Sequence, residues 1–115
     1  MDKNNLKIEL DKLSKKSSVE ELQKYIKDMI ETRKFRTSLL ERMILLTEEI
    51  GELAKEIRKM DNNLLVDAHK DYSSSLENEM VDVFICLMGM YELLDIDLVQ
   101  ALKNKEELNF KREWK

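Results

Sequence analysis

The chain has 115 residues, room for one domain, with no proline, two glycines, one cysteine and one histidine. These counts exclude a dinucleotide-binding turn, a phosphate-binding loop, an internal disulfide and a zinc cage of soft ligands, and they disfavour a histidine-based triad. Carboxylates outnumber Lys and Arg by 24 to 20, for a formal net charge of -4, which argues against a nonspecific nucleic-acid binder and favours chemistry on oxygen ligands.

The first 17 residues are predicted to form an N-terminal extension that contains a short helix. Three leucines share one face of that helix: Leu6, Leu10 and Leu13. The extension is charged throughout, so we expect no signal peptide, and the longest uncharged run is far shorter than a membrane span. The sequence therefore predicts a cytoplasmic protein with no membrane partner.

Residues 18–115 are predicted to form one helical domain with four main helices. The wealth of Leu, Glu, Lys and Met and the absence of proline favour helix throughout. The expected spans, with their caps, are about 18–34, 37–60, 73–94 and 97–112. Three capping pairs mark helix starts: Ser18 with Glu21, Ser38 with Glu41, and Asp97 with Gln100. Residues 61–72 are the one predicted loop.

The second main helix carries an apolar seam with heptad-like spacing. Its members are Leu39, Met43, Leu46, Ile50, Leu53, Ile57 and Met60. Such a seam is predicted to pack against another helix. Three carboxylates, Glu49, Glu52 and Glu56, follow one edge of the seam and are expected to border the contact.

The third main helix is apolar nearly all round, because Asp82 is the only charge between Met80 and Tyr91. A helix without a polar face is buried on all sides or is completed by another subunit. The sequence thus predicts an all-α fold, a helix bundle of four main helices that oligomerisation completes.

Two spaced carboxylate pairs form the first candidate site. Glu79 and Asp82 stand at i, i+3 on the third helix, and Glu49 and Glu52 have the same spacing on the second. Side-by-side packing of these helices would bring four carboxylates together, and each like-charged pair about 5 Å apart repels by roughly 3 kcal/mol at an effective dielectric of about 20. A hard divalent ion, Mg²⁺ or Mn²⁺, would neutralise them.

Other interpretations of these acids remain open at this point. A Glu-x-x-Glu pair on a charged helix is commonly a solvated face, and Asp82 can instead form a structural salt bridge with a Lys or Arg. The absence of histidine from both pairs disfavours an oxygen-activating iron centre.

The second candidate set lies on the fourth helix, where Lys105, Asn109 and Arg112 are spaced i, i+4 and i+7. Two cations flanking an amide suit phosphate oxygens. The alternative is that the cations only favour the C-terminal end of the helix dipole.

Together these segments resemble a known family. The stretches LTEEIGELAKEIRK, ENEMVDVFICL and IDLVQALKNKEELNFKREW look like the MazG-like nucleotide pyrophosphohydrolases of the all-α NTP pyrophosphatase superfamily, over about residues 19–114. The family's E-x-x-E and E-x-x-D metal motif falls on the two carboxylate pairs. Its K-x-x-x-N-x-x-R pattern falls on Lys105, Asn109 and Arg112.

The resemblance implies Mg²⁺-dependent hydrolysis of a nucleoside triphosphate between its α and β phosphates, in nucleotide-pool house-cleaning, with Mn²⁺ as a substitute ion. The catalytic metal ligands would be Glu49, Glu52, Glu79 and Asp82. Lys105, Asn109 and Arg112 would hold the triphosphate, and Glu48 would be a lower-ranked base or outer ligand. The family assembles as dimers or dimers of dimers, so a homodimer or homotetramer is expected.

Two other functions compete with hydrolysis. One is a catalytically degenerate module that binds a nucleotide or a partner helix without turnover. The other is a structural helical oligomer whose charges are solvated. In the 61–72 loop, His69, Lys70 and Tyr72 are further candidates for substrate contact, and Trp114 is expected to dock against the protein.

Overall fold

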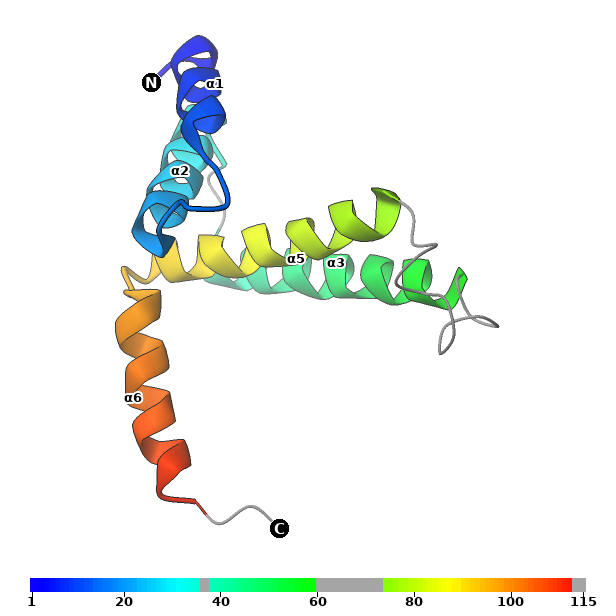
Figure 1. The fold of residues 1–115 in the computed structure, drawn as a ribbon. Helices are drawn as coiled ribbons and strands as arrows, with labels where there is room; N and C mark the ends of the chain where they lie inside the picture. Colours follow the sequence, from blue (N-terminus) through cyan, green and yellow to red (C-terminus); the bar gives the residue numbers. More distant parts are fainter. Residues whose placement is uncertain (36–37, 60–73, 113–115) are drawn as a thin grey trace. The chain divides into compact units, whose positions relative to one another are not determined.

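The computed structural model describes residues 1–35, 38–59 and 74–112, and every regular element in those ranges is an α-helix. The helices are α1 (Lys3–Lys12), α2 (Val19–Thr32), α3 (Leu39–Lys59), α5 (Ser74–Leu93) and α6 (Leu98–Phe110) (Figure 1). The all-α class and the short N-terminal helix are confirmed. Within the described ranges, no helix has the length and apolar character that crossing a membrane requires.

The helix starts follow the capping chemistry that the sequence predicts. The Ser18 hydroxyl accepts a hydrogen bond from the Glu21 backbone N–H at 3.0 Å, and the Glu21 carboxylate accepts one from the Ser18 N–H at 3.2 Å. Ser38 and Glu41 make the same reciprocal pair at 3.2 and 3.3 Å. Asp97 caps α6 by accepting from the Gln100 N–H at 3.1 Å. These side chains satisfy backbone donors that a helix start leaves without partners.

Two helix ends differ from the prediction. The helix predicted to reach about residue 34 stops at Thr32, because Lys34 adopts a left-handed backbone with φ of 57°. The helix predicted to run through Arg112 ends at Phe110. There the backbone tightens to i, i+3 hydrogen bonds, and the Arg112 N–H donates to the Asn109 carbonyl at 3.0 Å.

The described chain divides into two compact units, and the first comprises residues 1–35 and 91–115. In it α1 packs on α2, with Leu6, Ile26 and Met29 buried. Leu13 is half-buried as expected, whereas Leu10 is 42% exposed, so the predicted leucine face of α1 is only partly covered.

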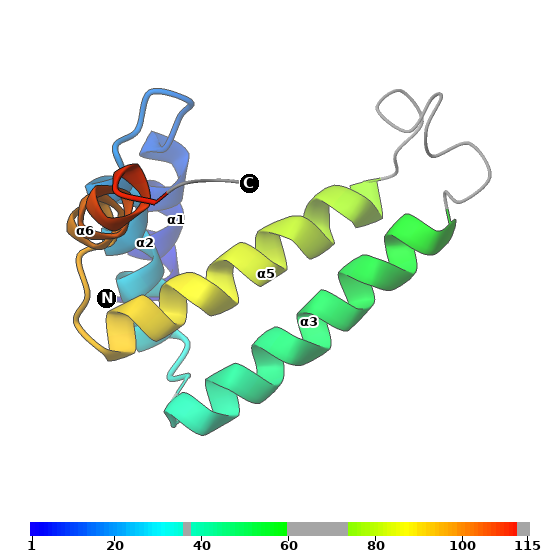
Figure 2. The same ribbon diagram turned by 90° about the horizontal axis from the view of Figure 1, so that it is seen from below.

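The second unit, residues 36–90, holds α3 and most of α5. The two helices lie side by side and antiparallel, as Figures 1 and 2 both show. Among the described residues of this unit, the large buried side chains are Arg42, Leu46 and Met88. Two members of the predicted α3 seam, Leu46 and Leu53, are buried or half-buried. Four others are 37–49% exposed: Leu39, Met43, Ile50 and Ile57.

Helix α5 is less covered than an apolar helix is expected to be. Met80, Val81, Phe84 and Leu87 are each between 40% and 56% exposed. Single apolar side chains on a surface are ordinary, but this many on one short hairpin are not. Much of the apolar surface that the sequence places in a bundle core is thus exposed in the single chain.

The α3–α5 contact should depend on Leu46 and not on its neighbour Leu45. Leu46 is 9% exposed and Leu45 41%. Leu46→Ala is expected to lower the free energy of unfolding by about 2–3 kcal/mol, because it leaves a cavity in the contact. Leu45→Ala should cost less than about 1 kcal/mol. Urea unfolding followed by helical circular dichroism, at one protein concentration, measures both, and equal losses would contradict the packing described.

Candidate functional site

Three carboxylates from two helices converge in the second unit. Glu49 comes from α3, and Glu79 and Asp82 come from α5. One carboxylate oxygen from each lies within 4.8 Å of the other two. Glu49 and Glu79 are half-buried and Asp82 is exposed, so the cluster has a covered side and an open side. An ion bound by these carboxylates would contact the half-buried Glu49 and Glu79 on one side and would be accessible to solvent on the other.

Helix periodicity explains why these three residues meet. Glu79 and Asp82 are three positions apart on α5 and so lie on adjacent turns of one face. Glu49 follows the buried Leu46 by three positions, which places it on the side of α3 that packs against α5. Because the helices run antiparallel, the middle of α3 lies opposite the first half of α5.

The electrostatics of the cluster are unfavourable in the absence of a cation. The pKa of the Glu49 carboxyl is raised, first by burial, then by a hydrogen bond with Glu79, and then by repulsion from Asp82, Glu79 and Glu52. No cation is among the groups that set this pKa. All of these effects favour the protonated form of the Glu49 carboxyl.

One oxygen of the cluster is buried without a partner. Glu79 Oε2 is enclosed and accepts no hydrogen bond from any residue that the structure describes. A buried carboxylate oxygen without a donor costs free energy, which a metal ligand bond or a water would recover. A Mg²⁺ or Mn²⁺ ion takes such oxygens as its preferred ligands, so the residues present fit a hard divalent cation.

Glu52, the fourth predicted ligand, is not part of this three-residue cluster. It stands one turn after Glu49 and is exposed. At about 100° per residue, its position is rotated by roughly 60° from that of Glu49, away from α5. Its charge still raises the pKa of Glu49. The structure thus brings together three of the four predicted ligands and places the fourth at the edge.

Two residues beside the cluster were not predicted to matter. Cys86 is half-buried one turn after Asp82, and burial, followed by the charges of Glu49 and Asp82, raises the pKa of its thiol. Arg42 is buried on α3, at 8% exposure, and its charge lowers the pKa of Cys86. The signal in the sequence was spacing, since Arg42 stands seven positions before Glu49 on the same face.

The second predicted set lies in the first unit. Lys105 and Asn109 belong to α6, and Arg112 follows the end of that helix. Lys105 and Arg112 are exposed. Asn109 is half-buried: its side-chain amide donates to Glu106 Oε2 at 3.4 Å, while its Oδ1 is buried without a hydrogen-bond partner among the described residues. Two exposed cations in one short stretch are compatible with binding an anion, whereas the buried Asn109 Oδ1 only accepts hydrogen bonds and does not add to that binding.

The remaining predicted residues are Glu48, those of the 61–72 loop, and Trp114. Glu48 is exposed on α3, about 100° round the helix from Glu49. The predicted 61–72 loop, with His69, Lys70 and Tyr72, lies outside the described residues, as does Trp114.

The three-carboxylate cluster has the donor chemistry of a divalent-cation site, which can polarise a phosphate or activate a water. Comparisons with protein-family profiles, with curated proteins and with solved structures found no match for this chain. Support for a function therefore comes from the motifs and from this geometry.

The raised pKa of Glu49 predicts a specific dependence of stability on pH. The folded state keeps a proton that the unfolded state has already lost, so the metal-free protein loses stability as the pH rises through the raised pKa of Glu49. Glu49→Gln cannot ionise. In the presence of a chelator we expect its Tm to exceed that of the wild type by a few degrees near about pH 8, with the gap closing towards about pH 4.

The control for this experiment is Glu48→Gln, which removes the same charge from the exposed neighbouring position. Its Tm relative to the wild type should change little with pH. A gap for Glu49→Gln that is equal at both ends of the pH range would contradict the electrostatics described.

Proposed function

We propose that this protein is a Mg²⁺-dependent nucleotide pyrophosphohydrolase of the MazG-like kind. The reaction is hydrolysis of an NTP or dNTP between the α and β phosphates to a monophosphate and pyrophosphate, in nucleotide-pool house-cleaning. The observation that carries the proposal is that carboxylate oxygens of Glu49, Glu79 and Asp82 lie within 4.8 Å of one another. All three residues belong to the metal motif. The E-x-x-E and E-x-x-D halves of the motif begin 30 residues apart in the chain, and the cluster contains residues from both.

The proposal assigns the metal to the carboxylates. Glu49, Glu79 and Asp82 hold Mg²⁺, with Mn²⁺ as a substitute, and Glu52 is the fourth ligand at the edge. The buried and unpartnered Glu79 Oε2 supports this assignment. When bound, the ion supplies charge neutralisation for the phosphates and lowers the pKa of the attacking water.

The proposed substrate contacts come from Lys105, Asn109 and Arg112. Their support is the motif and the chemistry of the side chains, because a lysine ammonium and an arginine fork are the groups that bind phosphate oxygens most strongly. Lys105 and Arg112 are both exposed. In this proposal they hold the triphosphate while the carboxylates hold the metal.

The assembly and the compartment are also part of the proposal. We infer a cytoplasmic homodimer or homotetramer. The support is the small buried core of the single chain, which has five buried large apolar residues among those described. A chain of this length ordinarily buries roughly two thirds of its unfolded surface, so a second copy would complete the core.

Hydrolysis is expected from the wild-type protein in a screen of NTPs, dNTPs and oxidised or deaminated analogues with Mg²⁺. Asp82→Asn and Glu52→Gln should each lower kcat by about 100-fold or more, because each removes a proposed metal ligand. The measurement is pyrophosphate release. Glu56→Gln is the matched control, since it removes a carboxylate one turn from Glu52 that pairs with Lys59 at 2.9 Å, and it should keep the wild-type rate.

Each outcome of this screen distinguishes a different function. Nucleotide binding by calorimetry without any pyrophosphate would favour the degenerate binding module. No binding, no hydrolysis and no change of Tm with millimolar Mg²⁺ would favour the structural oligomer. Wild-type rates in both ligand variants would contradict the metal assignment.

Lys105 and Arg112 should affect substrate binding more than the chemical step. Lys105→Ala and Arg112→Ala are each expected to raise KM about 10-fold, with a smaller effect on kcat, because the phosphate contacts exist before the bond breaks. Lys103→Ala removes a nearby exposed cation of the same helix and is the control. A fall in kcat with unchanged KM would contradict the assigned role.

A further inference from the structure

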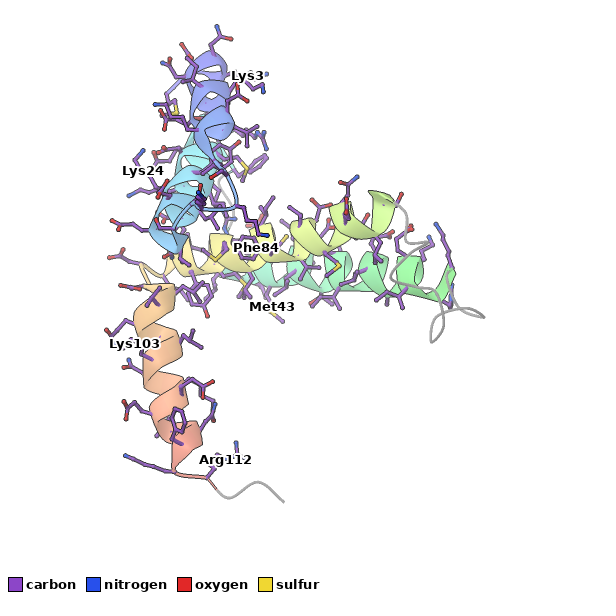
Figure 3. The ribbon with its side chains drawn as sticks, viewed as in Figure 1. Lys3, Lys24, Met43, Phe84, Lys103 and Arg112 are labelled. Atoms are coloured by element: carbon purple, nitrogen blue, oxygen red, sulfur yellow. The ribbon has the colours of Figure 1, made fainter. Side chains whose placement is uncertain are left out.

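One charged side chain is buried in the second unit. Arg42 of α3 is 8% exposed, and no other charged side chain among the described residues is buried to that extent. Its neighbours along the chain, Glu41 and Met43, are exposed, and Figure 3 labels Met43 on α3. Arg58, near the end of the same helix, is exposed as well. Burial of a guanidinium costs free energy, so a place for it on the covered side of α3 calls for a physical reason.

Arg42 lies close to the carboxylate cluster. It precedes Glu49 by seven positions, which puts the two side chains two turns apart on the covered side of α3. On α5, Cys86 follows Asp82 by four positions, one turn further on the same face. Because the helices are antiparallel, both steps lead in the same direction along the hairpin (Figure 2). The part of α5 that contains Cys86 therefore lies towards Arg42.

The electrostatics of Cys86 agree with this placement. The pKa of its thiol is raised, first by burial and then by the charges of Glu49 and Asp82. The charge of Arg42 acts on the same thiol in the opposite direction. The thiol is thus within electrostatic reach of both the guanidinium and the cluster, and all four groups belong to the second unit.

Little else in the contact fixes how α3 and α5 are aligned along their length. The other large buried side chains among the described residues of this unit are Leu46 and Met88. Apolar contacts are non-directional, so they tolerate sliding of one helix along the other. A slip of one helical turn is about 5.4 Å, which exceeds the 4.8 Å within which the carboxylate oxygens of the cluster lie. A slip of that size would separate Glu49 from Asp82.

We propose that Arg42 is a positioning residue of the proposed metal site. Its buried guanidinium favours the register in which Glu49 of α3 meets Asp82 of α5. Selection of one register is the best-attested role of a buried polar or ionic group between helices, because a shifted contact places that group among different neighbours. The planar fork of arginine makes its contacts directional. The inference rests on the proposed metal site and does not depend on the nucleotide.

Mn²⁺ binding measured by electron paramagnetic resonance tests this role in Arg42→Met, which replaces the guanidinium by an unbranched apolar group. We expect Mn²⁺ to bind about tenfold more weakly than to the wild type, a loss typical of residues that support metal ligands. The direction of the change is decisive, because a cation near a metal opposes the charge of the metal. If Arg42 acted through its charge alone, its removal would strengthen Mn²⁺ binding.

Arg58→Met is the matched control, since it removes the same group from an exposed position of the same helix. Its Mn²⁺ affinity should equal that of the wild type, because an exposed charge is screened by water and salt. All proteins are measured well below their Tm, with helical circular dichroism intact, so that a loss of affinity does not reflect unfolding. An equal loss of affinity in Arg58→Met and Arg42→Met would overturn the proposal.

Arg42→Lys keeps the test decisive if Arg42→Met fails to fold. Lysine keeps the charge and lacks the planar fork, so Mn²⁺ affinity should still fall, by a smaller factor than in Arg42→Met. Mn²⁺ binding by either folded variant that equals or exceeds that of the wild type would overturn the proposal.

The outcomes separate this inference from the proposed function. A wild type that binds Mn²⁺ no more tightly than Arg42→Met counts against the role of Arg42 alone. A wild type without saturable Mn²⁺ binding overturns the metal site and this inference with it. The expected Mn²⁺ affinities without release of pyrophosphate from any nucleotide support the role of Arg42 and count against the reaction alone.

Discussion

Repulsion between like charges is the constraint on which the candidate site depends. Three carboxylates share a space of 4.8 Å, and the pKa of Glu49 is raised by its burial and by its acidic neighbours. A fold can hold such a group only if something neutralises it. The raised pKa of Glu49 favours its protonated form, and a hard divalent cation would replace that proton. The buried Glu79 Oε2 accepts no hydrogen bond from any described residue, and a bound cation would give it a partner.

The same hairpin explains why the acids and the apolar surface are both present on a small chain. Helices α3 and α5 bury few of their own side chains, and each has two exposed edges. On α3, Glu49, Glu52 and Glu56 follow one edge, and the exposed Leu39, Met43, Ile50 and Ile57 follow the other.

The sequence predicts local features well and helix rotation poorly. Capping at Ser18 and Asp97 is local hydrogen-bond chemistry. The position of Glu79 and Asp82 on one face follows from their spacing along a single helix. The predicted α3 seam included Ile50, which is 49% exposed in the single chain. The covered side of α3 contains Arg42, Leu46 and Leu53, and Ile50 lies at its margin. A rotation of this size is set by tertiary packing, which periodicity along one helix does not contain.

Direct measurement of Mn²⁺ binding by electron paramagnetic resonance tests the central claim most directly, because it needs no substrate and no knowledge of the reaction. The account predicts saturable binding to the wild type, displacement by Mg²⁺, and loss of that binding in Glu79→Gln while the protein stays helical. Equal Mn²⁺ binding by the wild type and by Glu79→Gln, or no saturable binding by either, would contradict it.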